Sequence, residues 1–456
     1  MQKETASIKK MSVFALTWPI FIETLLRTML GNVDTFMLST YSDDAVGAVG
    51  VVSQISYILI MLYNVVSSGT LVLISQYLGA KKKKEASVVA VTSIAGSLIF
   101  GLFVGLAVFL FRSQILTFLN LPPELMGYAM TFLGIVGGFS FTQALIATLS
   151  AIIRSYGNTR ITMYISVGMN ILNIIGNSIF LYGLLGAPKM GVTGVAIATV
   201  ISQAVGVVAM LIVMLTGLNQ KFSFRDLVPL PWEILRDILK IGLPSAGEGI
   251  AYEASQLTIT RIITVLGKVA LTTRVYTLNI MYFVVVFSVA VGQGTQIVVG
   301  HLVGAGDNEK AYKTCIKSLR YAVVVAIILA GIVSFFSEQL LGIFTDDRAI
   351  IEMGSKLLLI AVILEPGRVF NIVIINSLRA AGDARFPVIM GIISMWGIGV
   401  LLSYFLGVAC GLGLIGVWIA FASDEWFRGI AMLLRWRSRV WYKMALVKNQ
   451  NIEMPA

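Results

Sequence analysis

Carboxylate side chains interrupt several apolar stretches of this sequence. Asp34 has no Lys or Arg within four positions on either side, and the same holds for Glu248 and Glu253. An ionisable group at bilayer depth costs about 3 kcal/mol on insertion scales, so such groups are rare unless they are paired or functional. A carboxylate without a partner in a low-dielectric setting can take up a proton or hold a metal cation. For Glu248 and Glu253 the alternative is a partner on another helix, such as Arg274 or Arg368.

A second polar pattern lies in the apolar stretch NILNIIGNSIF. Asn170, Asn173 and Asn177 recur at helical spacing, along one face of a helix. Buried amides need hydrogen-bond partners, and an amide stripe facing Asp34 would supply ligands for a cation and its water. We therefore predict a cation-coupling site made of Asp34, Asn173, Asn177 and Thr199. The alternative is that the amides join neighbouring helices by hydrogen bonds.

Other buried charges stand three or four positions from an opposite charge, where side chains on a helix are neighbours and neutralise each other. We expect these to fix helix packing. A second substrate or cation site is predicted where acids and aromatic residues gather in the second half, although such aromatic residues also fit a plain core. The predicted structural pairs are Glu23 with Arg27, Glu365 with Arg368, and Asp424 and Glu425 with Arg428; the second-site residues are Glu248, Glu253, Tyr252, Tyr276 and Tyr282.

The elements that must position these residues are membrane helices. Of the 456 residues, 57% are hydrophobic and only 12% are charged, about half the charged fraction of a soluble domain. The apolar residues come in blocks of roughly 20, which is the length needed to cross a bilayer. Twelve spans are expected, at 13–39, 46–76, 87–111, 128–153, 161–184, 192–216, 241–266, 272–299, 321–344, 356–378, 386–408 and 412–434.

The basic residues fix the orientation. Clusters such as the lysines at 81–84 and the arginines of the last segment all fall in alternate connections. An excess of Lys and Arg marks cytoplasmic loops, so both termini are expected in the cytoplasm. The net charge of +11 then reflects orientation and contact with anionic lipid, and it gives no reason to expect nucleic acid as a partner. The opposite connections hold few basic residues: Arg112, Lys189, Lys268, Arg274, Arg348 and Lys356.

The two halves of the chain repeat each other at an offset of 225 residues. Pro19 then meets Pro244, Glu23 meets Glu248, and Arg154 meets Arg379; such matches are hard to obtain by chance. An even number of helices per half gives both halves the same orientation, so the repeat is parallel and pseudo-symmetric. We predict an N-lobe (1–216, helices 1–6), a cytoplasmic amphipathic linker (217–240) and a C-lobe (241–456, helices 7–12) with a basic cytoplasmic tail.

Several segments resemble the multidrug and toxic compound extrusion (MATE) family of the MOP flippase superfamily. They are TWPIFIETLLRTMLGNVDTFMLST (17–40), SQYLGAKKKKEA (75–86) with its repeat VGHLVGAGDNEKA (299–311), RSYGNTR (154–160), LRAAGDARFP (378–387) and MGVTGVAIATVIS (190–202). The resemblance implies a fold of twelve helices in two lobes and export of organic cations in exchange for Na⁺ or H⁺. It also implies that Asp34 is the acid of the first helix, with Asn173 and Thr199 in the N-lobe cation site.

The sequence departs from that family pattern at two places. One branch has an Asp where this chain has Asn177, so the N-lobe site keeps one carboxylate and leaves H⁺ and Na⁺ both open. Another branch has an acid in the tenth helix that would fall near Arg368, so that site is not expected here. Glu253 lies within about one residue of that branch's acid in the seventh helix, and Glu248 competes for the role.

Together these observations predict a secondary antiporter of the plasma membrane, such as a bacterial inner membrane. It would export amphipathic, cationic organic compounds by alternating access, as a monomer, without a cofactor or a structural metal. A flippase or exporter of a lipid-linked or polar metabolite is the alternative on the same fold. An intramembrane enzyme is not expected, because the sequence has neither an HExxH nor a GxSxG motif and holds one His. A channel is not expected either, since no segment resembles a selectivity filter.

Overall fold

The computed structural model describes residues 12–218, 220–227 and 231–447, and within these ranges the regular structure is helical, with no strand. Nine helices are long and apolar enough to cross a membrane, and one bent pair makes a tenth span. The nine comprise α2 (Val13–Ser39), α3 (Asp43–Gly79), α4 (Lys83–Phe118), α7 (Thr159–Tyr182), α8 (Val192–Gly217), α10 (Lys268–Gly304), α11 (Asn308–Phe335), α13 (Arg348–Ala380) and the composite helix over Arg385–Ala409.

Two further helices are long but more polar. Helix α9 (Trp232–Val265) has 34 residues and α16 (Gly413–Arg437) has 25, enough to span a bilayer at 1.5 Å per residue. Their acids and arginines make these two helices less apolar than the other spans. They account for the seventh and twelfth predicted spans.

Two spans are irregular inside the bundle. The fourth consists of α5 (Pro123–Phe132), a π-turn (Leu133–Gly137) and α6 (Phe141–Ser155), with a bend of 42°. Glycines at 137 and 138, followed by Ser140, lie at this break, and helices kink sharply at such residues and at π-bulges. The eleventh span is α14 (Arg385–Ser394), a π-turn (Met395–Val400), α15 (Leu401–Tyr404) and a second π-turn (Phe405–Ala409).

One sequence-based expectation about boundaries was wrong. The predicted ninth span, 321–344, ends earlier: α11 stops at Phe335 and a separate short helix, α12 (Ser337–Gly342), follows. The described part of the predicted linker contains a 3-10 turn (Phe224–Leu227) and the first turns of α9. Helix α9 begins at Trp232 and continues to Val265 through Pro244 in its interior, where a proline removes one backbone hydrogen bond. The linker's Pro229 lies outside the described residues, as do Lys3, Lys9, Lys10 and Lys448 of the basic segments.

The chain forms two compact units whose boundaries do not follow a single cut. One contains residues up to Phe21, Ser75–Lys81 and everything from Leu243 on, and we call it the C-unit. The other contains Ile22–Ile74 and Lys82–Gly242, and we call it the N-unit. The first turns of α2 thus belong to the C-unit, and the first turns of α9 belong to the N-unit. The predicted lobe boundaries at 216 and 241 stay a prediction.

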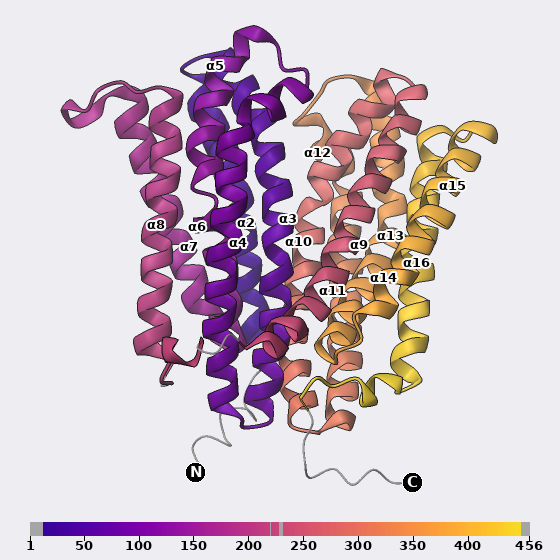
Figure 1. Ribbon diagram of the computed structural model, residues 1–456. Helices are drawn as coiled ribbons and strands as arrows, with labels where there is room; N and C mark the ends of the chain where they lie inside the picture. The colour runs from indigo at the N-terminus through magenta and orange to yellow at the C-terminus, as the bar shows by residue number, and fades with distance from the viewer. Residues whose placement is uncertain (1–11, 219, 228–230, 448–456) are drawn as a thin grey trace. The chain divides into compact units, whose positions relative to one another are not determined.

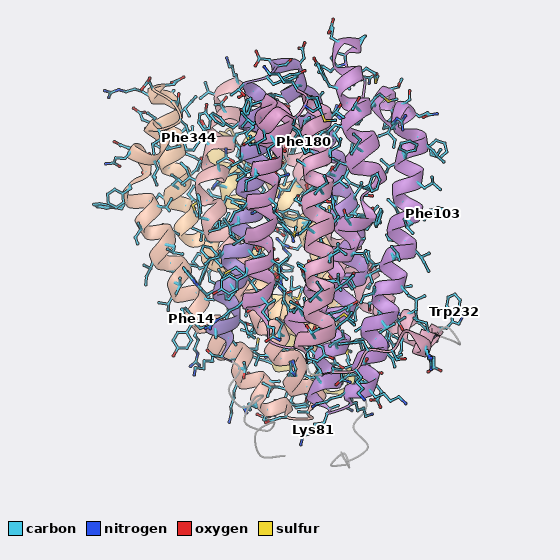
Figure 2. All side chains as sticks on the ribbon, turned by 90° about the vertical axis from the view of Figure 1, so that its left-hand side faces the viewer. Phe14, Lys81, Phe103, Phe180, Trp232 and Phe344 are labelled. Carbon is cyan, nitrogen blue, oxygen red and sulfur yellow. The ribbon has the colours of Figure 1, made fainter. Side chains whose placement is uncertain are left out.

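Within each unit a few helix pairs supply most of the packing. In the C-unit, α13 packs against α10, α11 and α16, and in the N-unit α7 packs against α8 and α4 against α6 (Figure 1). Apolar side chains also cover the outside of the helices, as expected of surfaces that face lipid. Phe103 of α4 is 70% exposed and points away from the neighbouring helices, and Trp232 at the start of α9 is 69% exposed (Figure 2).

Glycines allow the closest helix contacts, and those contacts follow the repeat. In the C-unit, a Cβ on Gly79 would collide with the backbone of His301, and one on Gly304 would collide with the backbone of Gln76. Gly79 and Gly304 are equivalent positions in the two halves, as are Gln76 and His301. The end of α3 and the end of α10 therefore cross through equivalent contacts, in which a glycine of each helix lies against the backbone of the other.

The described part of the basic tail lies against the C-unit. After α16, a short 3-10 turn (Val440–Lys443) buries Trp441 completely against Trp436, with ring centroids 4.0 Å apart. The backbone N–H groups of Leu446 and Val447 donate to Gln76 Oε1, and Gln76 Nε2 donates to the carbonyl of Ala380. This C-terminal segment ties the last turn of α3 to the loop after α13.

Candidate functional site

The N-unit holds a carboxylate whose partner is an amide. Asp34 lies in the second half of α2 and its Oδ1 accepts a 2.6 Å hydrogen bond from Nδ2 of Asn177 on α7. Among the described residues no Lys, Arg or His lies within ion-pair distance of Asp34, in contrast to Glu23 three turns earlier on the same helix. Asp34 is thus a single negative charge set between membrane helices with only neutral contacts.

The amides continue from Asp34 as one hydrogen-bonded row. Asn177 Nδ2 also donates to Asn173 Oδ1 at 3.1 Å, and Asn173 Nδ2 donates to the hydroxyl oxygen of Thr199 on α8 at 3.1 Å. The Thr199 hydroxyl in turn donates to the carbonyl of Val195. The structure therefore brings together all four residues of the predicted cation-coupling set. Asn170 is separate, and its amide donates to the carbonyl of Leu26.

One acceptor in this row has no donor. Asn173 and Asn177 are fully buried, and the Oδ1 atom of Asn177 makes no hydrogen bond. A buried carbonyl oxygen without a donor is uncommon and asks for an explanation. Next to a carboxylate, such an oxygen is suited to a small cation or to a proton carried by the acid.

The predicted pair of Glu23 with Arg27 is present, and a nearer arginine joins it. Glu23 Oε1 lies 2.6 Å from Arg154 at the end of α6, while Arg27 is 3.7 Å away and half exposed. Thr162 also donates to Glu23 Oε2. The nearer arginine comes from another helix, and spacing within one helix cannot reveal it.

Glu248 has the same kind of partner in the C-unit. Its Oε2 lies 2.6 Å from Arg379 near the end of α13. The expected partners Arg274 and Arg368 are not the ones observed, and Glu248 is not a free acid for a second site. Glu23 with Arg154 and Glu248 with Arg379 are equivalent pairs under the offset of 225 residues. That equivalence in the sequence was the signal that could have found both arginines.

The remaining predicted pairs are present and merge into one network. Arg368 lies 2.8 Å from Glu365 and 3.5 Å from Glu425, and Arg428 lies 2.7 Å from Asp424 and 3.1 Å from Glu425. Glu425 therefore joins α13 to α16. The network also includes polar donors: Asn371 to Glu425 Oε2 at 3.0 Å, and Ser394 to Asp424 Oδ1.

The other members of the predicted second site are not gathered in one place by the contacts found. Tyr276 stacks on Phe344 at a centroid distance of 5.2 Å, inside an apolar cluster. Tyr252 is 37% exposed. Glu253 has an interaction partner of its own, as does Tyr282. Within the described ranges no group of His, Cys, Asp and Glu is arranged to hold a metal ion.

A family model decides what kind of protein carries this site. The model described as MatE matches twice, at residues 19–179 and 244–405. The chain belongs to the MATE family. The two matches also reproduce the internal repeat, with one copy in each half.

Relatives of this MATE protein extend over nearly its whole length. The uncharacterized transporter YisQ of Bacillus subtilis is 48% identical over 438 residues, 96% of each chain. The probable multidrug resistance protein NorM of Thermotoga maritima is 28% identical over 459 residues, 99% of this chain and 97% of that one.

The fold also matches solved structures. A MATE protein in a bent conformation superposes with a TM-score of 0.89 at 21% identity, over 96% of this chain and 97% of that one. This confirms the predicted fold class of twelve transmembrane helices in two lobes. As a member of the MATE family, the chain is a multi-pass transporter of the plasma membrane and not an enzyme.

Proposed function

We propose that this MATE protein is a secondary antiporter that exports amphipathic organic cations in exchange for H⁺ or Na⁺. The observation that supports this most directly is the Asp34 group, a carboxylate with only neutral contacts beside a buried carbonyl oxygen without a donor. The working unit in this proposal is a monomer. Several relatives are named multidrug resistance proteins.

Coupling follows from a difference in affinity between two states. When Asp34 is ionised, it accepts the Asn177 hydrogen bond and ties α2 to α7. A proton or Na⁺ on the carboxylate changes that contact, so the bound ion favours a different arrangement of α2. A ligand shifts such an equilibrium only by its differential affinity for the two states. Opposite binding preferences of ion and cargo then link their movements.

The energy available is sufficient for useful export. One charge moving inward gains about 2.3 kcal/mol per 100 mV of membrane potential. That corresponds to roughly fiftyfold accumulation for each net charge that moves inward; a one-for-one exchange against a monovalent organic cation moves no net charge and is driven by the concentration gradient of the ion. No nucleotide or other cofactor is needed for this mechanism, and the coupling ion is the only co-substrate.

We expect Asp34→Asn to reduce gradient-driven ethidium export to the background rate, at least tenfold below wild type. The variant keeps the size and hydrogen-bonding shape of the side chain but cannot exchange a charge. Export is measured in proteoliposomes under a pH gradient, a Na⁺ gradient, both, or neither. The gradient that drives the wild type identifies the ion.

The matched control is Asp44→Asn, which removes an exposed carboxylate at the start of α3 and should leave export unchanged. If Asp34→Asn exports normally under the driving gradient, Asp34 is not the coupling residue. If correctly inserted wild-type protein moves no ethidium under any gradient, export of organic cations is contradicted and a lipid or metabolite cargo becomes the better proposal.

A further inference from the structure

The C-unit contains a buried arginine that has no acid to pair with. Arg274 of α10 is 8% exposed. Its guanidinium donates to two neutral groups on α9, the hydroxyl of Thr260 and, at 3.0 Å, Oε1 of Gln256. Its Nε–H is buried and makes no hydrogen bond. Within the described ranges Arg274 thus keeps a full positive charge without a counter-charge.

Other arginines of comparable burial are neutralised. Arg154, Arg368, Arg379 and Arg428 each lie within 3.1 Å of a Glu or Asp oxygen. A charge held between membrane helices without a partner is unfavourable and marks a functional position by default. Arg274 is the exception that needs an explanation.

The two neutral groups orient the guanidinium without neutralising it. Gln256 and Thr260 lie one turn apart on α9 and hold the two terminal nitrogens. Side chains so held lose little freedom when an anion arrives, and the planar fork of Arg matches the two oxygens of a carboxylate. The arrangement is that of a preorganised anion receptor.

The surrounding face of α9 is polar and partly open. Tyr252, Gln256 and Thr260 follow each other at four-residue steps on one side of the helix. Tyr252 is 37% exposed, and the other two are half-buried. Such a polar row is unfavourable against lipid. Tyr252 adds an aromatic surface one turn from Gln256 on which a ring of a bound molecule can lie.

The repeat shows that this charge is particular to the second half. The position equivalent to Arg274 in the first half is Val49, which is buried and apolar. In the described part of the first half, Asp34 contacts α7 and not the helix equivalent to α10, and its own counterpart in the second half is Ile259. Neither charge is therefore repeated in the other half.

We propose that Arg274, held by Gln256 and Thr260, binds the carboxylate of the transported compound. This inference rests on the proposed export function and assigns to it a residue that recognises the carboxylate of a cargo. A small inorganic anion or a lipid phosphate would be recognised by the same chemistry, and the experiment separates these sources.

The test uses two dyes that differ in one group. Rhodamine 110 has a free carboxylate, and rhodamine 123 is its methyl ester. Binding of each is measured by fluorescence anisotropy to full-length protein in phosphatidylcholine nanodiscs, in a gluconate buffer. We expect Arg274→Gln to weaken rhodamine 110 binding about tenfold or more, since a charge-assisted hydrogen-bond pair is lost, and to change rhodamine 123 binding less than twofold. Arg274→Lys, which keeps the charge but not the fork, should fall between.

The control is Arg261→Gln, an exposed arginine on the same helix as Gln256 and Thr260, which should change neither dye. Retained binding of rhodamine 123 shows that each variant is folded. If Arg274→Gln weakens both dyes equally or neither, Arg274 does not recognise the carboxylate and the proposal is overturned.

Two further arms identify other occupants of the site. If replacing gluconate by chloride abolishes the preference for rhodamine 110, the site belongs to an inorganic anion. If adding phosphatidylglycerol to the phosphatidylcholine bilayer abolishes the preference for rhodamine 110, the site binds a lipid phosphate. Either result contradicts the proposal. Failure of the underlying export function looks different: rhodamine 123 would not be transported under any ion gradient, whatever residue stands at position 274.

Discussion

At the scale of single residues, the most informative feature is the pair of equivalent ion pairs. Glu23 with Arg154 and Glu248 with Arg379 each join the first helix of a half to the cytoplasmic end of another helix, at the same 2.6 Å separation. Charges buried between membrane helices bind each other strongly only when the partner is correctly placed. The pair of Glu23 with Arg154 therefore holds α2 against α6, and the pair of Glu248 with Arg379 holds α9 against α13.

We expect Glu23→Gln to lower the free energy of unfolding by about 3–5 kcal/mol, because it leaves Arg154 buried without its counter-charge. Glu248→Gln should have a similar effect. Both are measured by denaturant unfolding in detergent micelles. Glu309→Gln serves as the control, because its ion pair with Arg439 is half exposed and should contribute less than about 1 kcal/mol. Equal effects of the three variants would contradict a structural role for the buried pairs.

The residues of the coupling site were easier to predict than their contacts. The helical spacing of the asparagines placed Asn173 and Asn177 on one face, and the structure puts that face against Asp34 and Thr199. The partners of Glu23 and Glu248 come from sequence positions more than a hundred residues away. Spacing within a helix carries no information about such contacts, and the repeat alone pointed to them.

At the scale of helices, close approach depends on particular glycines. In the N-unit, Gly69 of α3 lies against the backbone of Ile238 in α9, and Gly242 of α9 lies against the backbone of Val65 in α3. A Cβ at either position would collide with main-chain atoms, which cannot turn aside as a side chain can. Small residues allow membrane helices to pack backbone to backbone in this way.

We expect Gly69→Ala to lower the free energy of unfolding by about 1–3 kcal/mol, because the added methyl group separates α3 from α9. The matched control is Gly50→Ala in the same helix, where nothing lies within 4 Å of the new Cβ. That change should stay within about 0.5 kcal/mol. Thermal unfolding in one detergent compares the two. A Gly69 variant as stable as the control would show that α3 and α9 can separate without loss.

Element boundaries were predicted well where a turn residue ends the helix and poorly where the break lies inside a span. Helix α7 ends at Tyr182 and is followed by Gly183, whose φ of +73° favours glycine; the predicted end was two residues beyond Tyr182. The break between α11 and α12 has no Gly or Pro to announce it. The polar spans α9 and α16 were predicted from the charge clusters and turn signals that bound them, since composition alone does not single them out.

At the scale of the whole molecule, the two units are not simply the two halves of the chain. Residues up to Phe21 and Ser75–Lys81 belong to the C-unit, whereas α9 up to Gly242 belongs to the N-unit. Pro19 and Pro244, which are equivalent in the repeat, lie within three residues of these crossing points. A proline weakens the helix hydrogen bonding around it. Helices α2 and α9 thus each have a point at which they can bend, whereas α3, which also crosses at Ile74, has no proline.

We expect the second half, residues 231–456, to be unstable when produced alone, because its unit lacks the first turns of α2 and the last turns of α3. Co-production of residues 1–230 should restore a folded, protease-resistant protein. The measurement is the fraction of each fragment that survives limited trypsin digestion in membranes, with the intact chain as reference. A second half that resists trypsin equally well alone would show that the segments from the first half are dispensable.

The exchanged helix starts have a consequence for the origin of the molecule. A protein made of one repeat could not have completed its own unit within a single chain, because the first turns of its first helix would have belonged to a neighbour. Two copies exchanging those turns would have formed a closed, swapped dimer. Fusing two such copies would join the partners without changing which turns belong to which unit. The present chain keeps that exchange as an internal one.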